Sequence, residues 1–324
     1  MGIAMSDSWL LLTNDDGIDA RPLHLLIAAL LARNHKVAVL APSENHSATG
    51  MKLSLAIPLA VRERSDLCAE LSTENDELYM FELDGTPCDT IITALDGGLK
   101  KLMADIEVKM VISGINIGPN LSQDTYHSGT IAAAREAGLY GMPALACSWS
   151  SFSEEGVEKA IEATIPVIEA CLAVLPNKPV NLKRPYIDVA SPHLSDWPGE
   201  SKKSWLNDPV TALRTAFQQG ELLLNLNIPP DWNGEYATTR LGMRWYRDAV
   251  VFDEKKETST FTIGAAKIDY DPVDRGDCDA DISGFSSITC LPSWPLMHPL
   301  ALDERLLAWC LENSESGMPV WLHN

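Results

Sequence analysis

Apolar and polar positions in the first half of the chain follow a strand–helix succession. Residues 9–13 form a short apolar run, and residues 20–34 then repeat apolar side chains at helical spacing. The same succession predicts further strands at 36–41, 53–61, 78–83, 108–112 and 143–147, and further helices at 87–95, 128–139 and 154–175. Because largely apolar strands that alternate with helices are typical of a parallel sheet, we predict an α/β fold with helices on both faces of a mostly parallel sheet.

The second half of the chain has a different pattern. No clean period appears between residues 176 and 219. Beyond it, the pattern predicts a strand at 221–228, hairpin strands at 238–245, 249–252 and 258–263, a last strand at 284–290 and a last helix at 300–311. A chain of 324 residues is long for one compact domain, so we expect one large domain whose second half is elaborated by a hairpin extension and a terminal helix.

The composition, with 46% apolar and 22% charged residues, is that of a soluble globular protein. No window reaches the ~20 consecutive apolar residues of a membrane span. The first residues also lack the features of a secretory signal, so we expect a cytoplasmic protein. The seven cysteines are widely spaced and include no C-x-x-C pair, which indicates neither a zinc ribbon nor a disulfide framework.

The formal net charge of −20 restricts the partners of the chain. Long nucleic acid and anionic membranes would be repelled by such a field, so we expect neither as a partner. A small phosphate ester can bind only where a metal ion or oriented backbone N–H groups reverse the local sign of the potential.

Polar clusters follow the ends of the predicted strands. They lie at residues 14–16, 43–47, 84–86 and 113–120. In a parallel sheet the ligand crevice lies beyond the carboxyl ends of the strands, so we expect these clusters to meet at one edge of the sheet.

Asp15 and Asp16 are the first candidates for chemistry. Consecutive strand residues point to opposite faces, so these two carboxylates converge only where the strand ends and Gly17 turns the chain. Two carboxylates ~4 Å apart repel by about 4 kcal/mol at an effective dielectric of about 20, and a divalent cation reverses this. Oxygen donors favour Mg²⁺ or Mn²⁺ over zinc. The alternative is that one aspartate caps the next helix while its neighbour is solvated.

Three further segments carry groups suited to a metal or a phosphate. In the loop 113–120, Gly114 allows close backbone approach and Asn116 offers a neutral amide oxygen; the alternative is a simple Gly/Asn turn. Ser128-Gly129-Thr130 opens a predicted helix, whose free N–H groups form an anion site or are capped by the hydroxyls. The hydroxyl of Ser47 can complete a hard-metal shell, or belong to an ordinary loop serine.

Taken in chain order, these motifs resemble those of the SurE (survival protein E) family of nucleotidases. The motifs are Asn14-Asp15-Asp16-Gly17, Ala41-Pro42 followed by Ser47, Gly85-Thr86-Pro87, Ser113-Gly114-Ile115-Asn116-x-Gly118-x-Asn120-Leu121, Ser128-Gly129-Thr130-x-Ala132-Ala133, Leu224-Asn225-Leu226-Asn227-Ile228-Pro229, Thr239-Arg240-x-Gly242 and the stretch from Asp281 to Pro292. The resemblance therefore covers most of the chain.

The resemblance implies a Rossmann-like domain over residues 1–230, and a hairpin oligomerisation region with the last strand and the C-terminal helix over 231–324. It implies 5′- and 3′-nucleotidase activity on nucleoside monophosphates, polyphosphate cleavage in some members, and a homodimer or homotetramer with one divalent metal ion per subunit. The metal ligands that carry over are Asp15, Asp16, Ser47 and Asn116, with the two aspartates as catalytic residues. The residues expected around the phosphate are Asn14, Gly114, Asn120, Ser128, Gly129 and Thr130.

The chain also departs from the family pattern. The basic residue usual before the ligand serine is absent, and only His46 there can carry a positive charge. His127 replaces the tyrosine usual before Ser-Gly-Thr, with Tyr126 one place earlier, and residues 176–219 resemble an insertion. These changes bear on substrate choice and rate more than on the metal ligands.

Other functions stay open at this point. A phosphoaspartate phosphatase would use one aspartate as a nucleophile, but such enzymes have Asp-x-Asp rather than adjacent carboxylates. A receiver-like signalling module also carries paired acids, but is roughly one small domain in length. A paralogue that binds nucleotides without turnover is the third alternative.

Overall fold

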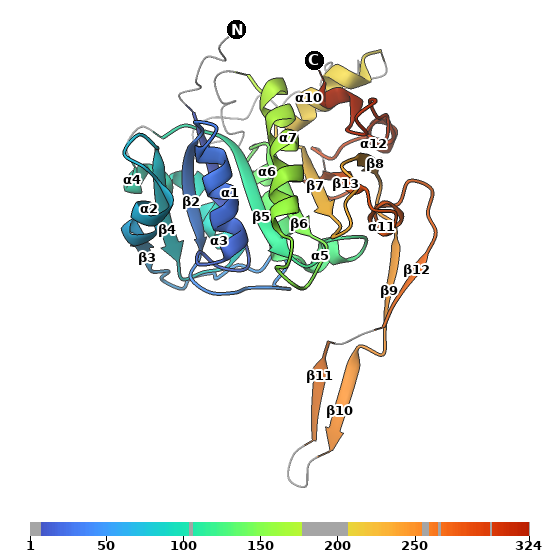
Figure 1. The fold of residues 1–324 in the computed structure, drawn as a ribbon, viewed down its shortest axis with the longest axis horizontal. Coiled ribbons are helices and arrows are strands. Elements are labelled where there is room, and N and C mark those ends of the chain that lie inside the picture. The colour runs from blue at the N-terminus through green and yellow to red at the C-terminus, as the bar shows by residue number, and fades with distance from the viewer. Residues whose placement is uncertain are drawn as a thin grey trace.

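A computed structural model describes residues 8–103, 106–176, 207–254, 259–264, 267–298 and 300–323. Within these ranges the molecule centres on a nine-stranded sheet in the order β3-β4-β2-β1-β5-β6-β7-β13-β8 (Figure 1). The strands from β4 to β7 in this order run parallel, whereas β3, β13 and β8 run the opposite way. The predicted α/β fold with a mostly parallel sheet is confirmed.

The bounds of the elements are as follows. The strands of the sheet are β1 (Trp9–Thr13), β2 (Lys36–Pro42), β3 (Val61–Glu63), β4 (Leu78–Leu83), β5 (Val108–Ile117), β6 (Ala144–Trp149), β7 (Leu222–Ile228), β8 (Tyr236–Thr239) and β13 (Ser286–Pro292). The helices are α1 (Arg21–Leu31), α2 (Ser65–Leu71), α3 (Pro87–Thr93), α4 (Leu99–Leu102), α5 (Asp124–His127), α6 (Gly129–Leu139), α7 (Glu158–Val174), α10 (Pro209–Gln218), α11 (Asp277–Ile282) and α12 (Glu304–Trp309), with a π-helical turn at Ala94–Gly98 and a 3-10 turn at Val320–Leu322.

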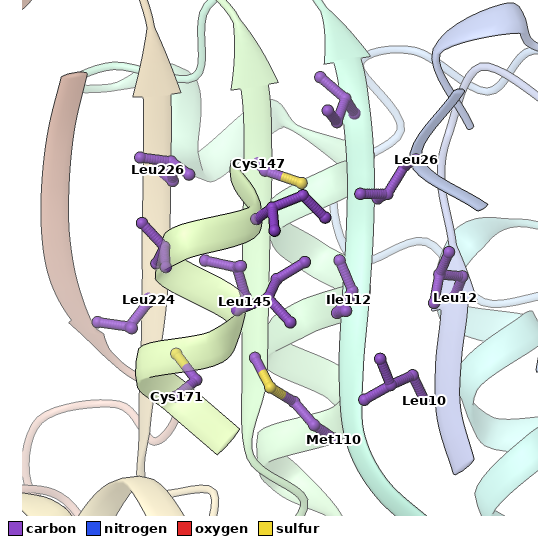
Figure 2. Packing of buried hydrophobic residues seen from close by; sticks show 14 of the residues in the cluster. Leu10, Leu12, Leu26, Met110, Ile112, Leu145, Cys147, Cys171, Leu224 and Leu226 are labelled. Carbon is purple, nitrogen blue, oxygen red and sulfur yellow. The ribbon is translucent and has the colours of Figure 1, made fainter. Parts of the chain in front are cut away.

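Alternation along the central strands divides the apolar core into two layers. Leu10 and Leu12 of β1 belong to the layer with α1 and α7, and Leu11 between them belongs to the layer with α3 and α6. Figure 2 shows the first layer, in which apolar side chains of β1, β5, β6 and β7 lie side by side with Leu26 of α1 and Cys171 of α7. Because both faces of the sheet are covered, a ligand has access only at its edges.

Most predicted elements are confirmed with shifts at their ends. The strand predicted at 78–83 is β4, and the helix predicted at 20–34 is the shorter α1. The strand predicted at 108–112 continues to Ile117 as β5. The pattern does not predict α2, β12 or α11, which lie in polar stretches without an apolar period.

The strand predicted at 53–61 is wrong. Only Val61–Glu63 pairs with the sheet, as the short edge strand β3. The alternating apolar residues before it lie on the surface, where Leu55 is 76% and Ile57 is 62% exposed. Pro58 also lacks the N–H that a ladder needs. The apolar spacing there belongs to an exposed loop.

Four more strands form an arm that projects from the body (Figure 1). They are β9 (Met243–Arg247), β10 (Val250–Glu254), β11 (Ser259–Ile263) and β12 (Lys267–Asp271). β9 pairs with β12 near the body, and β10 pairs with β11 at the far end. Strands β8 and β13, from the same part of the chain, join the main sheet instead.

The division of the chain at residue 230 stays a prediction. The insertion predicted at 176–219 falls mostly on residues 177–206, which lie outside the described ranges, and its last part forms α10. No helix in the described part of the chain has the length and apolar character needed to cross a bilayer.

A buried ion pair holds the base of the arm to the body. Arg244 of β9 donates from Nη1 to Oδ2 of Asp124 at 2.9 Å, and the hydroxyl of Tyr246 donates to Oδ1 of the same carboxylate at 2.6 Å. Arg244 is only 3% exposed, and its guanidinium lies 5.2 Å from the ring centroid of Tyr246. Asp124 begins α5, directly before α6, so the arm is joined to the segment that leads into α6.

This anchor predicts a stability difference between two arginines of the same strand. Arg244→Met is expected to lower the free energy of unfolding by about 3 kcal/mol, because Asp124 would keep its burial without its partner. Arg247→Met is the control: Arg247 pairs with Asp269 while both side chains are more than half exposed, so we expect less than about 1 kcal/mol. Urea denaturation followed by tryptophan fluorescence measures both, and equal small losses would contradict the anchor.

Candidate active site

Asp15 and Asp16 lie where β1 ends and the chain turns. The side chain of Asn14 closes this turn: Nδ2 donates to the carbonyl of Gly17 at 2.8 Å, and Oδ1 accepts from the Gly17 N–H at 3.2 Å. Gly17 has φ +102°, and a Cβ there would lie 3.3 Å from the backbone of Glu44. The amide of Asn14 is therefore engaged in shaping the turn, and its predicted contact with phosphate stays a prediction.

Asp15 lies against the first turn of α6. Its Oδ1 accepts a 2.5 Å hydrogen bond from the hydroxyl of Thr130, and the carboxylate is 2% exposed. Gly129 leaves room for it, because a Cβ there would lie 2.9 Å from Oδ2 of Asp15. Burial raises the pKa of Asp15 to about 6, against the lowering effect of the Thr130 hydroxyl and with a smaller rise from the charge of Asp16.

Asp16 is half-buried and reaches toward two neighbouring loops. Its Oδ2 accepts from the N–H of Ile117 at 3.2 Å, and its Oδ1 accepts from Nδ2 of Asn45 at 3.1 Å. Burial raises the pKa of Asp16, with a further rise from the charge of Glu154, while the two hydrogen bonds lower it. Asp16 thus joins the ends of β1 and β5 to the loop after β2.

An irregularity in β5 brings Asn116 to this edge. The register between β5 and β6 shifts between Ser113 and Asn116. Gly114 makes the shift sterically possible: it has φ +133°, and a Cβ there would collide with the carbonyl oxygen of Cys147. The amide Nδ2 of Asn116 donates to the carbonyl of Gly118 at 2.7 Å, which leaves Oδ1 as the atom for a ligand.

Ser47 is connected to the two aspartates through its neighbours in the loop. The N–H of His46 donates to the carbonyl of Asp15 at 2.7 Å. Asn45 links Asp16 to Ser47, because its Nδ2 donates to Asp16 while its Oδ1 accepts from the N–H of Ser47 at 3.0 Å. Ser47 itself is exposed. The sequence reasoning missed Asn45, and its position two residues before the candidate ligand was the signal available.

The remaining candidates are engaged by the fold. Ser128 Oγ accepts from the N–H of Ile131 at 3.1 Å and so caps α6. Asn120 Nδ2 donates to Ser148 Oγ at 2.8 Å, while its N–H donates to Asn227 Oδ1 at 2.7 Å. Because the Thr130 hydroxyl donates to Asp15, a phosphate at this helix start would depend on backbone N–H groups and on the O–H of Ser128, whose oxygen accepts from Ile131.

The donor set at this edge fits a hard divalent ion. Burial raises the pKa values of two adjacent carboxylates, and no basic side chain of the described residues offsets it. A cation would supply the missing charge. The described residues contain no cluster of three or more His, Cys, Asp or Glu side chains that could hold an ion. Binding here would therefore use neutral oxygens, such as those of Asn116 and Ser47, beside Asp15 and Asp16.

Comparison with known proteins identifies the family of this chain. A family model described as "Survival protein SurE" matches residues 10–248. The chain belongs to the SurE family. The matched residues include most of β1, all of β5 and the start of α6, which are the elements that carry most of the candidate site residues.

Individual SurE relatives show the extent of the similarity. The protein named 5′-nucleotidase SurE of Prochlorococcus marinus (strain MIT 9303) is 32% identical over 242 residues, which cover 74% of this chain and 70% of the relative. The protein of the same name from Synechococcus sp. (strain CC9311) is 31% identical over 275 residues, covering 83% and 84% of the two chains. The crystal structure of the SurE protein from Aquifex aeolicus aligns with a TM-score of 0.60 at 23% identity, covering 89% of this chain and 94% of the other. That last likeness shows the fold.

The contact between Thr130 and Asp15 predicts a loss of function in an isosteric variant. Thr130→Val removes the hydroxyl that stabilises the carboxylate, and hydrogen bonds to charged groups contribute about 1.5–3 kcal/mol. We expect phosphate release from AMP to fall by roughly tenfold or more. Thr164→Val is the control, since the buried Thr164 hydroxyl lies in α7 without a hydrogen-bond partner among the described residues. Wild-type rates for Thr130→Val would contradict a role for this contact.

Proposed function

We propose that this chain hydrolyses nucleoside monophosphates to nucleoside and phosphate with the help of a divalent ion. The chain is a 5′-nucleotidase by its family, whose relatives carry that name. The observation that supports the metal-dependent mechanism is the meeting of Asp15, Asp16 and the end of β5 at the carboxyl edge of the sheet. Burial raises the pKa values of both carboxylates, and no basic side chain among the described residues offsets this rise.

The proposed ligands of the ion are Asp15, Asp16, Ser47 and Asn116, and Mg²⁺ or Mn²⁺ suits their oxygen donors. When bound, such an ion supplies positive charge to the phosphate oxygens and makes a water molecule more acidic. Thr130 and the α6 start fix Asp15 in place, and Gly118 fixes the amide of Asn116. The site is therefore preorganised before substrate arrives, which is what phosphoryl transfer chiefly requires.

The two aspartates have different surroundings, and we assign them different roles. Asp15 is buried against Gly129 and Thr130, so we assign its carboxylate the role of a negatively charged ligand of the cation. Asp16 is partly exposed, so its carboxylate can accept the proton of the attacking water as well. The substrate phosphate would then be oriented by the backbone N–H groups at the start of α6.

Finer features of the family belong to the same proposal. We include 3′-nucleotidase and exopolyphosphatase activities, because the proposed metal and phosphate contacts act on the phosphoryl group that all these substrates share. We also propose that the arm assembles subunits into a homodimer or homotetramer. Apolar side chains on it are exposed, with Phe261 70% and Ile263 82% accessible, and a lone two-stranded hairpin is marginally stable in water.

The proposed ligand set predicts a paired loss of activity and cation binding. Asp16→Asn is expected to lower Mn²⁺- or Mg²⁺-dependent phosphate release from AMP by at least about a hundredfold, as for other removed charge-stabilising groups. It should also abolish the rise in melting temperature that Mn²⁺ gives the wild type.

The control for this experiment is Asp19→Asn. Asp19 lies in the same loop, but its carboxylate is exposed and accepts from Arg64 at 2.9 Å. We expect the control to keep both the activity and the thermal shift. Undiminished activity in Asp16→Asn would overturn the proposed site.

The phosphoaspartate mechanism makes a different prediction. It requires a covalent phosphoenzyme on Asp15 or Asp16. Asp15 already accepts a hydrogen bond at Oδ1 from the hydroxyl of Thr130 and is only 2% exposed, which is unfavourable for in-line attack on a phosphate. Rapid acid quench with labelled AMP should trap no phosphoenzyme if water attacks directly. A paralogue that binds without turnover would instead show the Mn²⁺ thermal shift and no phosphate release.

A further inference from the structure

The loop after β6 displays an aromatic side chain at the edge of the sheet that carries the candidate site. Phe152 is 79% exposed. The loop that holds it is internally bonded: the indole Nε1 of Trp149 donates to the carbonyl of Ser153 at 2.9 Å, and the N–H of Ser151 donates to the carbonyl of Trp149 at 2.7 Å. These bonds hold the backbone on either side of Phe152, while its side chain is largely exposed.

The ring of Phe152 lies beside the end of β5, the strand that carries Asn116. The N–H of Gly118 donates to the carbonyl of Trp149 at 2.9 Å, which joins the two loops. The point that a Cβ of Gly118 would occupy is 3.2 Å from Cε1 of Phe152 and 3.7 Å from Nδ2 of Asn116. The exposed ring and the amide of a proposed metal ligand therefore border the same small space.

We propose that Phe152 stacks on the nucleobase of the substrate and so distinguishes nucleotides from other phosphate esters. This inference rests on the proposed function, because it requires the phosphate to sit at Asp15, Asp16 and Asn116. An aromatic ring recognises a base through its face, which needs no charge and is not opposed by a net charge of −20. The absence of a side chain at Gly118 lets the ring approach the end of β5 closely, because a Cβ there would lie only 3.2 Å from Cε1 of Phe152.

A second exposed aromatic, Tyr126, lies on α5, next to the loop after β2. It is 77% exposed, and its backbone carbonyl lies 3.2 Å from the point that a Cβ of Gly50 would occupy. Its neighbour His127 accepts from the N–H of Gly50 at 2.8 Å, so this residue pair borders the far end of the loop that carries Ser47. Phe152 is the stronger assignment, because its ring, and not only its backbone, approaches a proposed ligand.

The test compares AMP with ribose 5-phosphate, which has the same phosphate ester without a base. Phe152→Ala is expected to raise KM for AMP by roughly tenfold, within the range of base–aromatic stacking. Its kcat for AMP and its kinetics on ribose 5-phosphate should stay at wild-type values. Phe152→Trp should restore the wild-type KM for AMP. Tyr126→Ala is the matched control and should leave the preference for AMP unchanged.

Several outcomes would overturn the inference. Equal losses on AMP and ribose 5-phosphate would show that Phe152 supports the loop rather than the base. An unchanged KM for AMP in Phe152→Ala, or a selective rise in Tyr126→Ala, would place the base elsewhere. These results leave the proposed function standing if wild-type protein releases phosphate from both compounds with Mn²⁺. No release from either compound by the wild type would overturn the proposed function and this inference together.

Discussion

Two adjacent carboxylates held in a poorly solvated place are the constraint around which the candidate site is organised. Asp15 and Asp16 cannot both be charged there without compensation, and the surrounding elements supply part of it. Thr130 at the start of α6 bonds Asp15, while Ile117 after the β5 irregularity bonds Asp16. Asn45 from the loop after β2 bonds Asp16 as well. Each of the three elements that enclose the site is therefore attached to the carboxylate pair by a hydrogen bond that also lowers the pKa of an acid.

Much of this arrangement could be predicted from local patterns. Apolar runs at 9–13, 78–83 and 108–112 are confirmed as parallel strands of one sheet, because nearly complete burial leaves few alternatives for such runs. The meeting of Asp15, Asp16 and the Asn116 loop follows from the same rule, since the carboxyl ends of parallel strands share an edge. Turn geometry alone left open whether Asp15 and Asp16 cap a helix or bind a metal, and the family resemblance favoured the metal site.

The rest depends on contacts between residues far apart in the sequence. Thr130 was predicted as a phosphate contact, yet its hydroxyl is directed at Asp15, and no local pattern reports which partner a helix-start hydroxyl will find. In the sequence, Asn45 is one polar residue among several in a polar loop. Only the structure shows that it bonds both Asp16 and Ser47. The strand predicted at 53–61 is wrong for a related reason. Most of its alternating apolar side chains lie on the surface rather than in the core, and Leu55 is largely exposed.

The glycines of the site have a practical consequence for anyone who wishes to change its specificity. Gly114 and Gly129 touch the carbonyl of Cys147 and the carboxylate of Asp15 with no room for even a methyl group. These two glycines form the floor of the site, and a protein engineer can replace neither without moving its neighbours. The rim of the site, formed by Phe152 after β6 and Tyr126 on α5, is different, because both side chains are exposed. Libraries that vary the rim and keep the floor constant would sample new substrates while leaving the phosphate-handling centre undisturbed.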